Sequence, residues 1–487
     1  MTHAAPPPHR FAAFWAETRA LLALALPMMV AQIAQTATGF VDTVMAGQVG
    51  AEDLAAVSIG TSILLTVFLT LSGVVMAVNP LVSQQFGAGE HQAIGATVRQ
   101  GLWTGLGLGL LGVGLMFAAQ QGVSAWMTLD PAVEAKTHSY LTGATLGVPA
   151  IVLYRVLHAY SSSVNRTRPI MVISVLALLL NIPLNSVLIY GQFGLPALGG
   201  AGCGWATGIV FWFSLLALAG WTYWHPAYQS FAVWSRWTGP HWAQQRTLLR
   251  LGLPIALSYF VEVSAFTSVA LLIANLGAKV VAGHQVVISF TSVLYMVPLS
   301  LSVALSVRVG QAVGAGDYRA ARFNSHVGLA VGGVTALLSS LLVFWLRVPI
   351  AAIYTPDPDV IALAAGLLVF AAVFQLADAA QVIASGALRG YKITTAPMLI
   401  HTLSFWGIGL GLGLWLGLGQ GTLPLGYGTR PLGAAGFWWA LTLSLVLAAV
   451  LLVVLLAKES RRGVRRQILL AEGGARGELA TLRRGKP

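Results

Sequence analysis

Twelve long apolar stretches, separated by short polar or glycine-rich breaks, run through this chain of 487 residues. Each exceeds the roughly 20 residues that a helix needs to cross a bilayer's hydrocarbon core. They lie at residues 21–45, 55–82, 101–121, 138–162, 170–190, 200–223, 248–276, 281–309, 326–346, 361–387, 396–418 and 433–457. The pattern predicts an all-α polytopic membrane protein with twelve transmembrane helices.

The composition agrees with a lipid environment. Only 9% of the residues are charged, against roughly a quarter in soluble proteins. The formal net charge of +12 raises the question of nucleic acid, but the Lys and Arg residues lie in short loops and in the tail. Membrane topology explains them, so we expect no nucleic-acid partner. Cys203 is the single cysteine, which excludes an internal disulfide and a Cys/His metal cluster. No cofactor is expected.

The distribution of basic residues predicts the orientation. Of the 27 Lys and Arg residues, 22 fall in the N-terminal tail, in every second loop after it and in the C-terminal tail, whereas the opposite loops hold four. Since basic loops stay in the cytoplasm, both termini are expected there, in a multi-pass protein of the bacterial inner membrane. Residues 1–19 lack the short apolar core and cleavage site of a signal peptide, so the first helix is expected to be retained.

An internal repeat divides the chain. The segment 24–27 (LALP) recurs as 251–254 (LGLP), and 87–90 (GAGE) recurs as 314–317 (GAGD), both at an offset of 227 residues. A later match, 198–202 with 432–436, has an offset of 234 residues, which suggests an insertion of about seven residues within 416–430. Two six-helix lobes entering the membrane in the same sense are therefore expected, with a cavity between them.

We predict five segments from these boundaries. They are a cytoplasmic tail at 1–19, an N-lobe at 20–224, a cytoplasmic linker at 225–247, a C-lobe at 248–458 and a basic cytoplasmic tail at 459–487. The basic tail suits contact with anionic membrane lipid.

Three carboxylates lie inside apolar stretches: Asp42, Glu262 and Asp378. A charge at mid-bilayer costs about 2.5 to 3.5 kcal/mol on insertion scales, so such residues usually face a cavity and bind or relay cations. A structural pair with a base is the alternative, but Arg155, the one base well within a stretch, lies toward a cytoplasmic end and can snorkel. Competition between an incoming ion and an outgoing organic cation for one negative site is sufficient for antiport.

Other polar and helix-breaking residues extend the candidate site. Pro27 and Pro254 occupy equivalent positions, where a proline permits a kink, and we interpret them as hinges. Asn181 and Asn185 share one helix face, so they either line the cavity or connect helices. Gln35 stands at the position equivalent to Glu262. The isolated His158, His284 and His401 are interpreted mainly as structural groups.

Several segments resemble the NorM branch of the multidrug and toxic compound extrusion (MATE) family. They are 38–47 (TGFVDTVMAG), 181–185 (NIPLN), Leu253-Pro254 with Glu262, 282–285 (AGHQ), 377–382 (ADAAQV) and 387–392 (ALRGYK). The resemblance extends from about residue 20 to residue 460. It implies a V-shaped pair of lobes and a monomeric transporter that exports small organic cations by alternating access, in exchange for Na⁺ or H⁺.

The resemblance also implies roles for individual residues. Glu262 and Asp378 would form a coupling-cation site in the C-lobe, with Na⁺ as one candidate ion, and Asp42 would form a polar cluster with Asn181 and Asn185 in the N-lobe. Phe374 stands where this branch often has Tyr, which removes one possible oxygen ligand for Na⁺. Further positions match drug contacts of related transporters: Gln35, Ser62, Asn181, Asn185, Gln285, Tyr295 and Asp357.

Three other functions are alternatives. A flippase for lipid-linked sugars has a related fold, but its diphosphate cargo calls for a more cationic cavity. An integral-membrane transferase needs convergent catalytic groups near one interface, whereas the three acids are spread over both repeats. A channel fits a pseudo-symmetric chain with kinked helices less well than a carrier. The sequence therefore favours a multidrug efflux transporter over an enzyme.

Overall fold

The computed structural model describes residues 10–126, 129–235, 237–419 and 432–484, with side chains described for 11–125, 129–235, 237–419 and 432–469. Within these ranges, twelve helices or helix series are long and apolar enough to cross a membrane, as predicted. Most of these helices are several residues longer than the predicted apolar stretches, because the helical hydrogen bonding continues into the flanking residues. The suggested insertion at 416–430 falls largely outside the described residues.

The N-terminal half contains six of these spans. They are α1 (Arg10–Val49), α2 (Ala51–Val75) continued by α3 (Val78–Gly87), α4 (His91–Trp126), α5 (Pro131–Ser163), α6 (Arg168–Tyr190) and α7 (Ala201–Trp224). A short 3₁₀ turn, η1 (Gln192–Gly194), follows α6, and the short helix α8 (Pro226–Gln229) follows α7. Helix α1 begins inside the segment predicted as the N-terminal tail.

The C-terminal half repeats this order. Its spans are α9 (Trp242–Ala274), α10 (Ala278–Gly314), α11 (Tyr318–Tyr354), α12 (Pro358–Gly390), the series α13 (Thr395–His401), η2 (Thr402–Leu410) and α14 (Gly411–Leu418), and α15 (Ala434–Arg484). Helix α9 starts within the predicted linker, and α15 continues through the segment predicted as the C-terminal tail.

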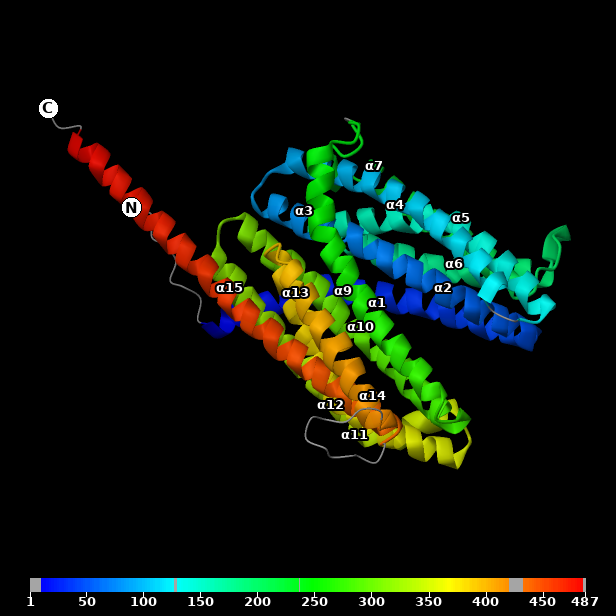
Figure 1. Ribbon diagram of the computed structural model, residues 1–487. Helices are drawn as coiled ribbons and strands as arrows, with labels where there is room; N and C mark the ends of the chain where they lie inside the picture. Colours follow the sequence, from blue (N-terminus) through cyan, green and yellow to red (C-terminus); the bar gives the residue numbers. More distant parts are fainter. Residues whose placement is uncertain (1–9, 127–128, 236, 420–431, 485–487) are drawn as a thin grey trace.

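Two bundles diverge from a common junction, which gives the molecule a V shape (Figure 1). Helix α1 starts beside the C-terminal bundle and ends at the tip of the N-terminal bundle, whereas α9 crosses in the opposite sense. The buried cores show that the two lobes exchange the starts of these helices. Leu21 and Met28 of α1 belong to a core with Leu301 and Leu305 of α10, while Leu248 of α9 belongs to the N-lobe core. Each lobe is therefore completed by the start of a helix from the other.

The lobes meet around a pseudo-twofold axis. Ser306, 227 residues after Asn79, donates from Oγ to Asn79 Oδ1 at 3.0 Å. A symmetric pair of hydrogen bonds flanks this contact: Gln84 Nε2 donates to the carbonyl of Gly390 (2.8 Å), and Gln311 Nε2 donates to that of Ser163 (2.9 Å). Both pairs are again related by the repeat offset.

Two equivalent glycines permit this approach. A Cβ atom at Gly87 would lie 1.9 Å from the carbonyl oxygen of Gln311, and one at Gly314 would lie 1.9 Å from that of Gln84. Any side chain at either position would therefore collide with the facing backbone. An ion pair between Glu17 of α1 and Arg308 of α10 adds to the junction. All of these contacts lie at the end of the V nearer to both termini.

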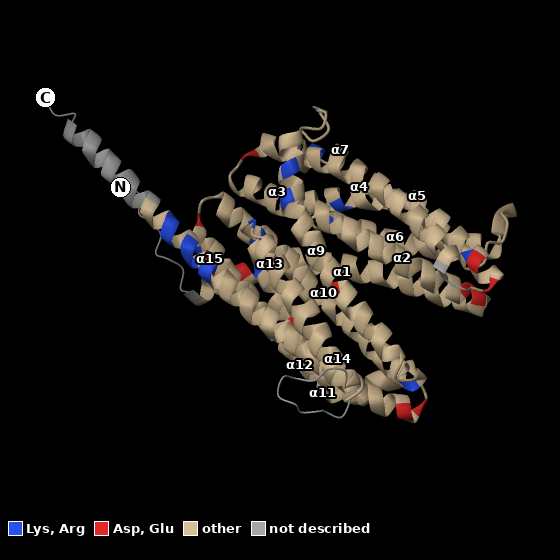
Figure 2. Cartoon of the chain, in the orientation of Figure 1, with Lys and Arg blue, Asp and Glu red and all other residues tan. Residues whose placement is uncertain are grey.

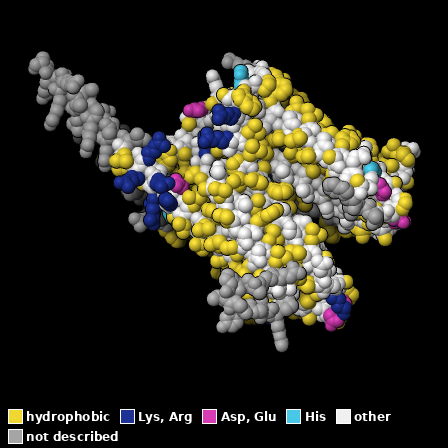
Figure 3. Space-filling view, in the orientation of Figure 1, with side chains coloured by type: hydrophobic (Ala, Val, Ile, Leu, Met, Phe, Trp, Pro, Cys, Tyr) yellow, Lys and Arg dark blue, Asp and Glu magenta, His cyan; other side chains and the backbone are white. Residues whose placement is uncertain are grey.

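The opposite tips each hold an ion cluster, and equivalent helices of the two lobes carry opposite charges in it. In the N-lobe, Lys136 contacts Glu52 (2.9 Å) and Asp53 (2.8 Å). In the C-lobe, Lys279 contacts Asp357 (3.7 Å) and Asp359. Arg347, near the end of α11, also lies toward the C-lobe tip. Most other basic side chains of the described chain gather toward the junction end (Figure 2). The bundle surfaces between these ends are largely apolar, as contact with lipid requires (Figure 3).

Candidate functional site

The C-lobe holds an acid pair, as the resemblance implied. Asp378 of α12 is buried, and Glu262 of α9, partly buried, lies within electrostatic range of it. Asp378 Oδ1 accepts a hydrogen bond from Gln381 Nε2 at 3.1 Å. The amide oxygen of Gln381 accepts in turn from His401 Nε2 at 2.9 Å. A chain of hydrogen bonds therefore leads from α13 to the carboxylate on α12.

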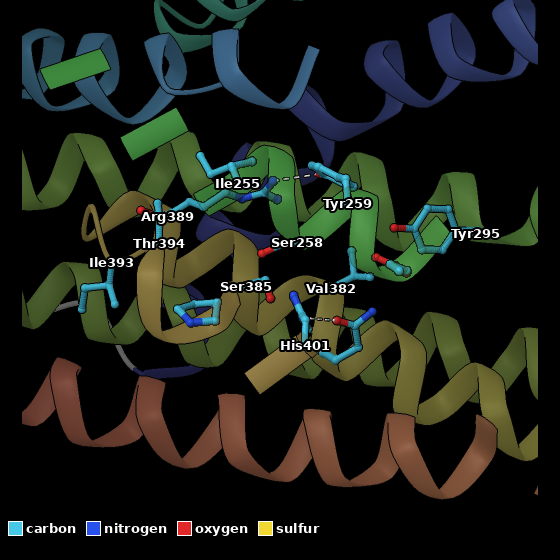
Figure 4. Close-up of a pocket in the computed structure, with 13 residues that line it drawn as sticks. Ile255, Ser258, Tyr259, Tyr295, Val382, Ser385, Arg389, Ile393, Thr394 and His401 are labelled. Carbon is cyan, nitrogen blue, oxygen red and sulfur yellow. Dashed lines mark hydrogen bonds between the residues drawn. The ribbon is translucent and has the colours of Figure 1, made fainter. Parts of the chain in front are cut away.

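A small pocket opens beside this chain (Figure 4). Its lining residues, Glu262 among them, come mainly from α9, α10, α12 and α13. The lining residues are Ile255, Ser258, Tyr259, Glu262, Tyr295, Gln381, Val382, Ser385, Arg389, Ile393, Thr394, Pro397 and His401. Tyr259 and Tyr295 bring aromatic rings, which suit organic cations.

A π-helical stretch positions one wall of the pocket. The α-helix α13 ends at His401, and η2 continues from Thr402 to Leu410 with π-helical hydrogen bonding. Segments of this kind are rare and often occur at functional sites. The Nδ1 atom of His401 is buried without a hydrogen-bond partner. The sequence interpretation gave His401 a mainly structural role and did not include it in the site.

Arg389 supplies a positive charge at the pocket's junction end. Its Nη1 donates to the hydroxyl of Tyr259 (2.9 Å) and its Nη2 to Ser302 Oγ (2.8 Å). Arg389 also interacts electrostatically with Glu262. The sequence interpretation counted it as a cytoplasmic loop residue because it stands near the end of an apolar stretch, so its place in the pocket was missed.

The N-lobe cluster also forms. Asp42 of α1 accepts from Asn185 Nδ2 at 2.6 Å and from Thr207 Oγ1 at 3.2 Å, and Asn185 also donates to Asn181 Oδ1 at 3.0 Å. All four side chains are buried. Asn181 also interacts with the Asp42 carboxylate, and Asn185 Oδ1 is buried without a hydrogen-bond partner, so the cluster retains an acceptor for a further polar ligand. The sequence analysis did not include Thr207.

The two acid clusters are not related by the repeat. Ile151 occupies the position equivalent to Asp378, and Val269 the position equivalent to Asp42. The pair Gln381–His401 does have a counterpart, since Tyr154 and Ser174 stand at the equivalent positions and their hydroxyls lie 3.3 Å apart. The two lobes therefore share this contact between helices, but their acidic residues stand at different positions of the repeat.

The remaining predicted contacts occupy different places. Tyr295 lines the C-lobe pocket. Gln35 accepts a hydrogen bond from Arg155 of the N-lobe at 3.1 Å. Ser62 on α2 and Gln285 on α10 have exposed side chains. Asp357 caps α12 within the ion cluster at the C-lobe tip, away from the pocket. Their contact with substrate stays a prediction.

The residues predicted as hinges lie inside continuous helices. Pro27 is within α1 and Pro254 within α9, each close to the junction of the lobes. Gly252 places α9 against the backbone of Val74 on α2, which brings this part of α9 into the lobe contact. Bending at the two prolines stays a prediction.

An aromatic group closes the pocket region behind the acids. Phe374 is buried and packs edge-on against Phe266 and Trp438, with ring centroids 5.9 and 5.8 Å apart. The Trp438 indole nitrogen donates to His284 at 3.2 Å. The phenyl ring of Phe374 offers no oxygen to an ion.

The asparagines of the N-lobe cluster lead to a stability prediction. Asn185→Ala removes the 2.6 Å donor from a buried carboxylate, and an unsatisfied buried polar group costs about 1–3 kcal/mol. We expect the detergent-purified variant to melt a few degrees lower than the wild type. Gln192→Ala, an exposed amide of the same lobe, is the matched control. Equal melting temperatures for the two variants would contradict a stabilising Asn185–Asp42 contact.

The fold and the buried polar sites of its two lobes define a secondary active transporter. A family model described as MatE matches residues 27–187 and 254–415, two blocks that begin at the repeated prolines. The chain therefore belongs to the MatE family. As a member it is a multidrug efflux transporter and not an enzyme.

Individual relatives agree with this assignment. The "Probable multidrug resistance protein NorM" of Chromobacterium violaceum is 53% identical over 451 residues, covering 93% of this chain and 96% of that protein. The "Multidrug resistance protein PmpM" of Pseudomonas aeruginosa is 44% identical over 457 residues, covering 92% of this chain and 93% of that protein. The MATE transporter NorM-NG, whose structure was solved in complex with a monobody, superposes with a TM-score of 0.77 at 44% identity, covering 91% and 94%.

Proposed function

We propose that this transporter exports organic cations across the bacterial inner membrane in exchange for protons, with Glu262 and Asp378 as the coupling site. The observation that carries the proposal is the acid pair beside a pocket with two tyrosine rings. A carboxylate pair and aromatic faces together suit a flat or bulky organic cation.

The donors around the acid pair favour a proton over Na⁺. Hard metal cations usually take several oxygen ligands, whereas a proton needs one carboxylate oxygen. Asp378 already accepts from Gln381, and Phe374 contributes no oxygen. The Asp42 cluster provides a second place where the same ion can bind.

The proposal includes the orientation of the chain. Basic residues near the junction end support cytoplasmic termini (Figure 2). The lobes would then be closed toward the cytoplasm and open outward in this structure. Both acid sites come from one chain, so a monomer in the lipid bilayer is sufficient for the exchange.

A gradient experiment tests this function. Purified protein in vesicles loaded with ethidium is given either a proton gradient or a Na⁺ gradient, and dye efflux is followed by fluorescence. We expect efflux with the proton gradient at least about tenfold faster than with the Na⁺ gradient. Efflux driven by Na⁺ alone would contradict proton coupling. The absence of efflux under both gradients, with folded protein, would contradict organic-cation export and favour a lipid-linked cargo.

A further inference from the structure

Arg155 of α5 is a partly buried base that the coupling scheme does not use. Its Nη2 donates to Gln35 Oε1 at 3.1 Å, and its guanidinium carbon lies 4.9 Å from the centre of the Phe68 ring. Its Nε is buried without a hydrogen-bond partner. Within the described chain, no carboxylate lies within ion-pair distance of it. The side chain is held between α1 and α2, contrary to the snorkelling that the sequence suggested.

Arg155 lies just on the open side of the point where the lobes meet. Helices α2 and α9 touch at Gly73, where a Cβ atom would lie 2.5 Å from Cα of Ala256. Phe68 precedes Gly73 on α2, and Tyr259 follows Ala256 on α9, so both stand one turn toward the open tips. Arg155 interacts electrostatically with Tyr259, which lines the C-lobe pocket.

The sequence repeat shows which part of the C-lobe corresponds to the surroundings of Arg155. Gln35, Phe68 and Arg155 stand 227 residues before Glu262, Tyr295 and Val382, and all three of those residues line the C-lobe pocket. The group around Arg155 is therefore the N-lobe counterpart of the pocket. At this counterpart an amide replaces the acid and a guanidinium replaces an apolar side chain, so its charge is reversed.

The fold itself does not require a base at this position, because Val382 fills the equivalent position of the C-lobe. An ionisable residue inside a membrane helix usually marks a functional site. The guanidinium group presents paired donors that match a carboxylate. The Nη2 group of Arg155 donates to Gln35, and its buried Nε has no hydrogen-bond partner.

We propose that Arg155, with Gln35 and Phe68, forms an anion subsite for the carboxylate of zwitterionic aromatic substrates. The cationic end of such a substrate faces the acid pair of the C-lobe, across the junction of the lobes. This inference rests on the proposed export of organic cations. It names the residue that would recognise the carboxylate of such a substrate.

Two dyes that differ by one ester group test the proposal. Rhodamine 110 has a free carboxylate and is a zwitterion, and rhodamine 123 is its cationic methyl ester. Binding of each dye is measured by fluorescence anisotropy on protein in nanodiscs of uncharged phosphatidylcholine. We expect Arg155→Gln to raise the Kd for rhodamine 110 at least about tenfold and to change that for rhodamine 123 less than about twofold. Arg246→Gln, an exposed base at the start of α9, is the matched control and should change neither.

Arg155→Lys separates the subsite from a role in folding. It keeps the charge but loses the paired donors, so we expect an intermediate loss of about threefold for rhodamine 110 alone. Equal weakening of both dyes, or no weakening of either, in the folded variants would overturn the anion subsite. Failure of the wild type to bind rhodamine 123 would instead overturn organic-cation export, and the subsite with it.

Discussion

Glu262→Gln and Asp378→Asn should each reduce proton-driven ethidium efflux at least about tenfold, to the level of vesicles without protein. The amides retain the size of the carboxyl groups, and the amide at position 378 keeps an oxygen that can accept the hydrogen bond from Gln381. An amide cannot bind the coupling proton or neutralise the charge of a bound cation. Loss of transport in folded variants therefore reports on charge and not on packing.

The control for these variants removes an acid outside the membrane helices. Glu90 is exposed in the loop between α3 and α4, and Glu90→Gln should leave efflux within about twofold of the wild type. Efflux above about a third of the wild-type rate in both pocket variants would mean that the ion is coupled elsewhere. The Asp42 cluster would then be the first place to look.

The double variant Gln84→Ala with Gln311→Ala should shift the transporter away from the state seen here. Each glutamine donates one hydrogen bond to the backbone of the opposite lobe. Such a bond contributes about 1 kcal/mol, and Gln311 also donates to Asn165 Oδ1 of the opposite lobe at 3.0 Å. The double variant should therefore change the ratio of the two states by at least roughly thirtyfold. The junction then opens more often, and the distant tips approach one another.

Distances between spin labels measure this shift. Ala51 and Ala278, the exposed first residues of α2 and α10, are labelled as cysteines after replacement of the single buried Cys203. We expect a new population at shorter distance in the double variant. Gln85→Ala is the matched control, because Gln85 donates to Thr97 within its own lobe. An unchanged distance distribution in the double variant would show that the two hydrogen bonds do not hold the junction.

Much of the fold could be predicted because lipid imposes strict rules. Apolar length fixed the number of spans, and the offset of 227 residues established two equivalent halves. The contact of Asn79 with Ser306 could not be predicted, although they stand at that same offset. A repeat shows which residues are equivalent but not which of them lie on the symmetry axis. The exchange of α1 and α9 between lobes was missed for the same reason.

The residue pattern alone singled out the charged members of the candidate site, whereas the drug-contact role of Tyr295 came from the resemblance to the MATE family. Glu262, Asp378 and Asp42 were conspicuous because an isolated carboxylate is rare in such a stretch. Gln381 and Thr207 are uncharged, and neither has a spacing that distinguishes it from a residue joining two helices. The π-helical turn after His401 depends on how α13 packs. These features follow from helix packing, which the sequence pattern does not specify.

The tip clusters also bear on how such a chain arose. Glu52 and Lys279 stand at equivalent positions of the two halves, yet they have opposite charges and opposite roles in their ion clusters. In a homodimer of one ancestral half, both positions would hold the same residue type. The opposite charges can therefore have been acquired only after duplication gave each half its own coding sequence. From then on each half could evolve separately.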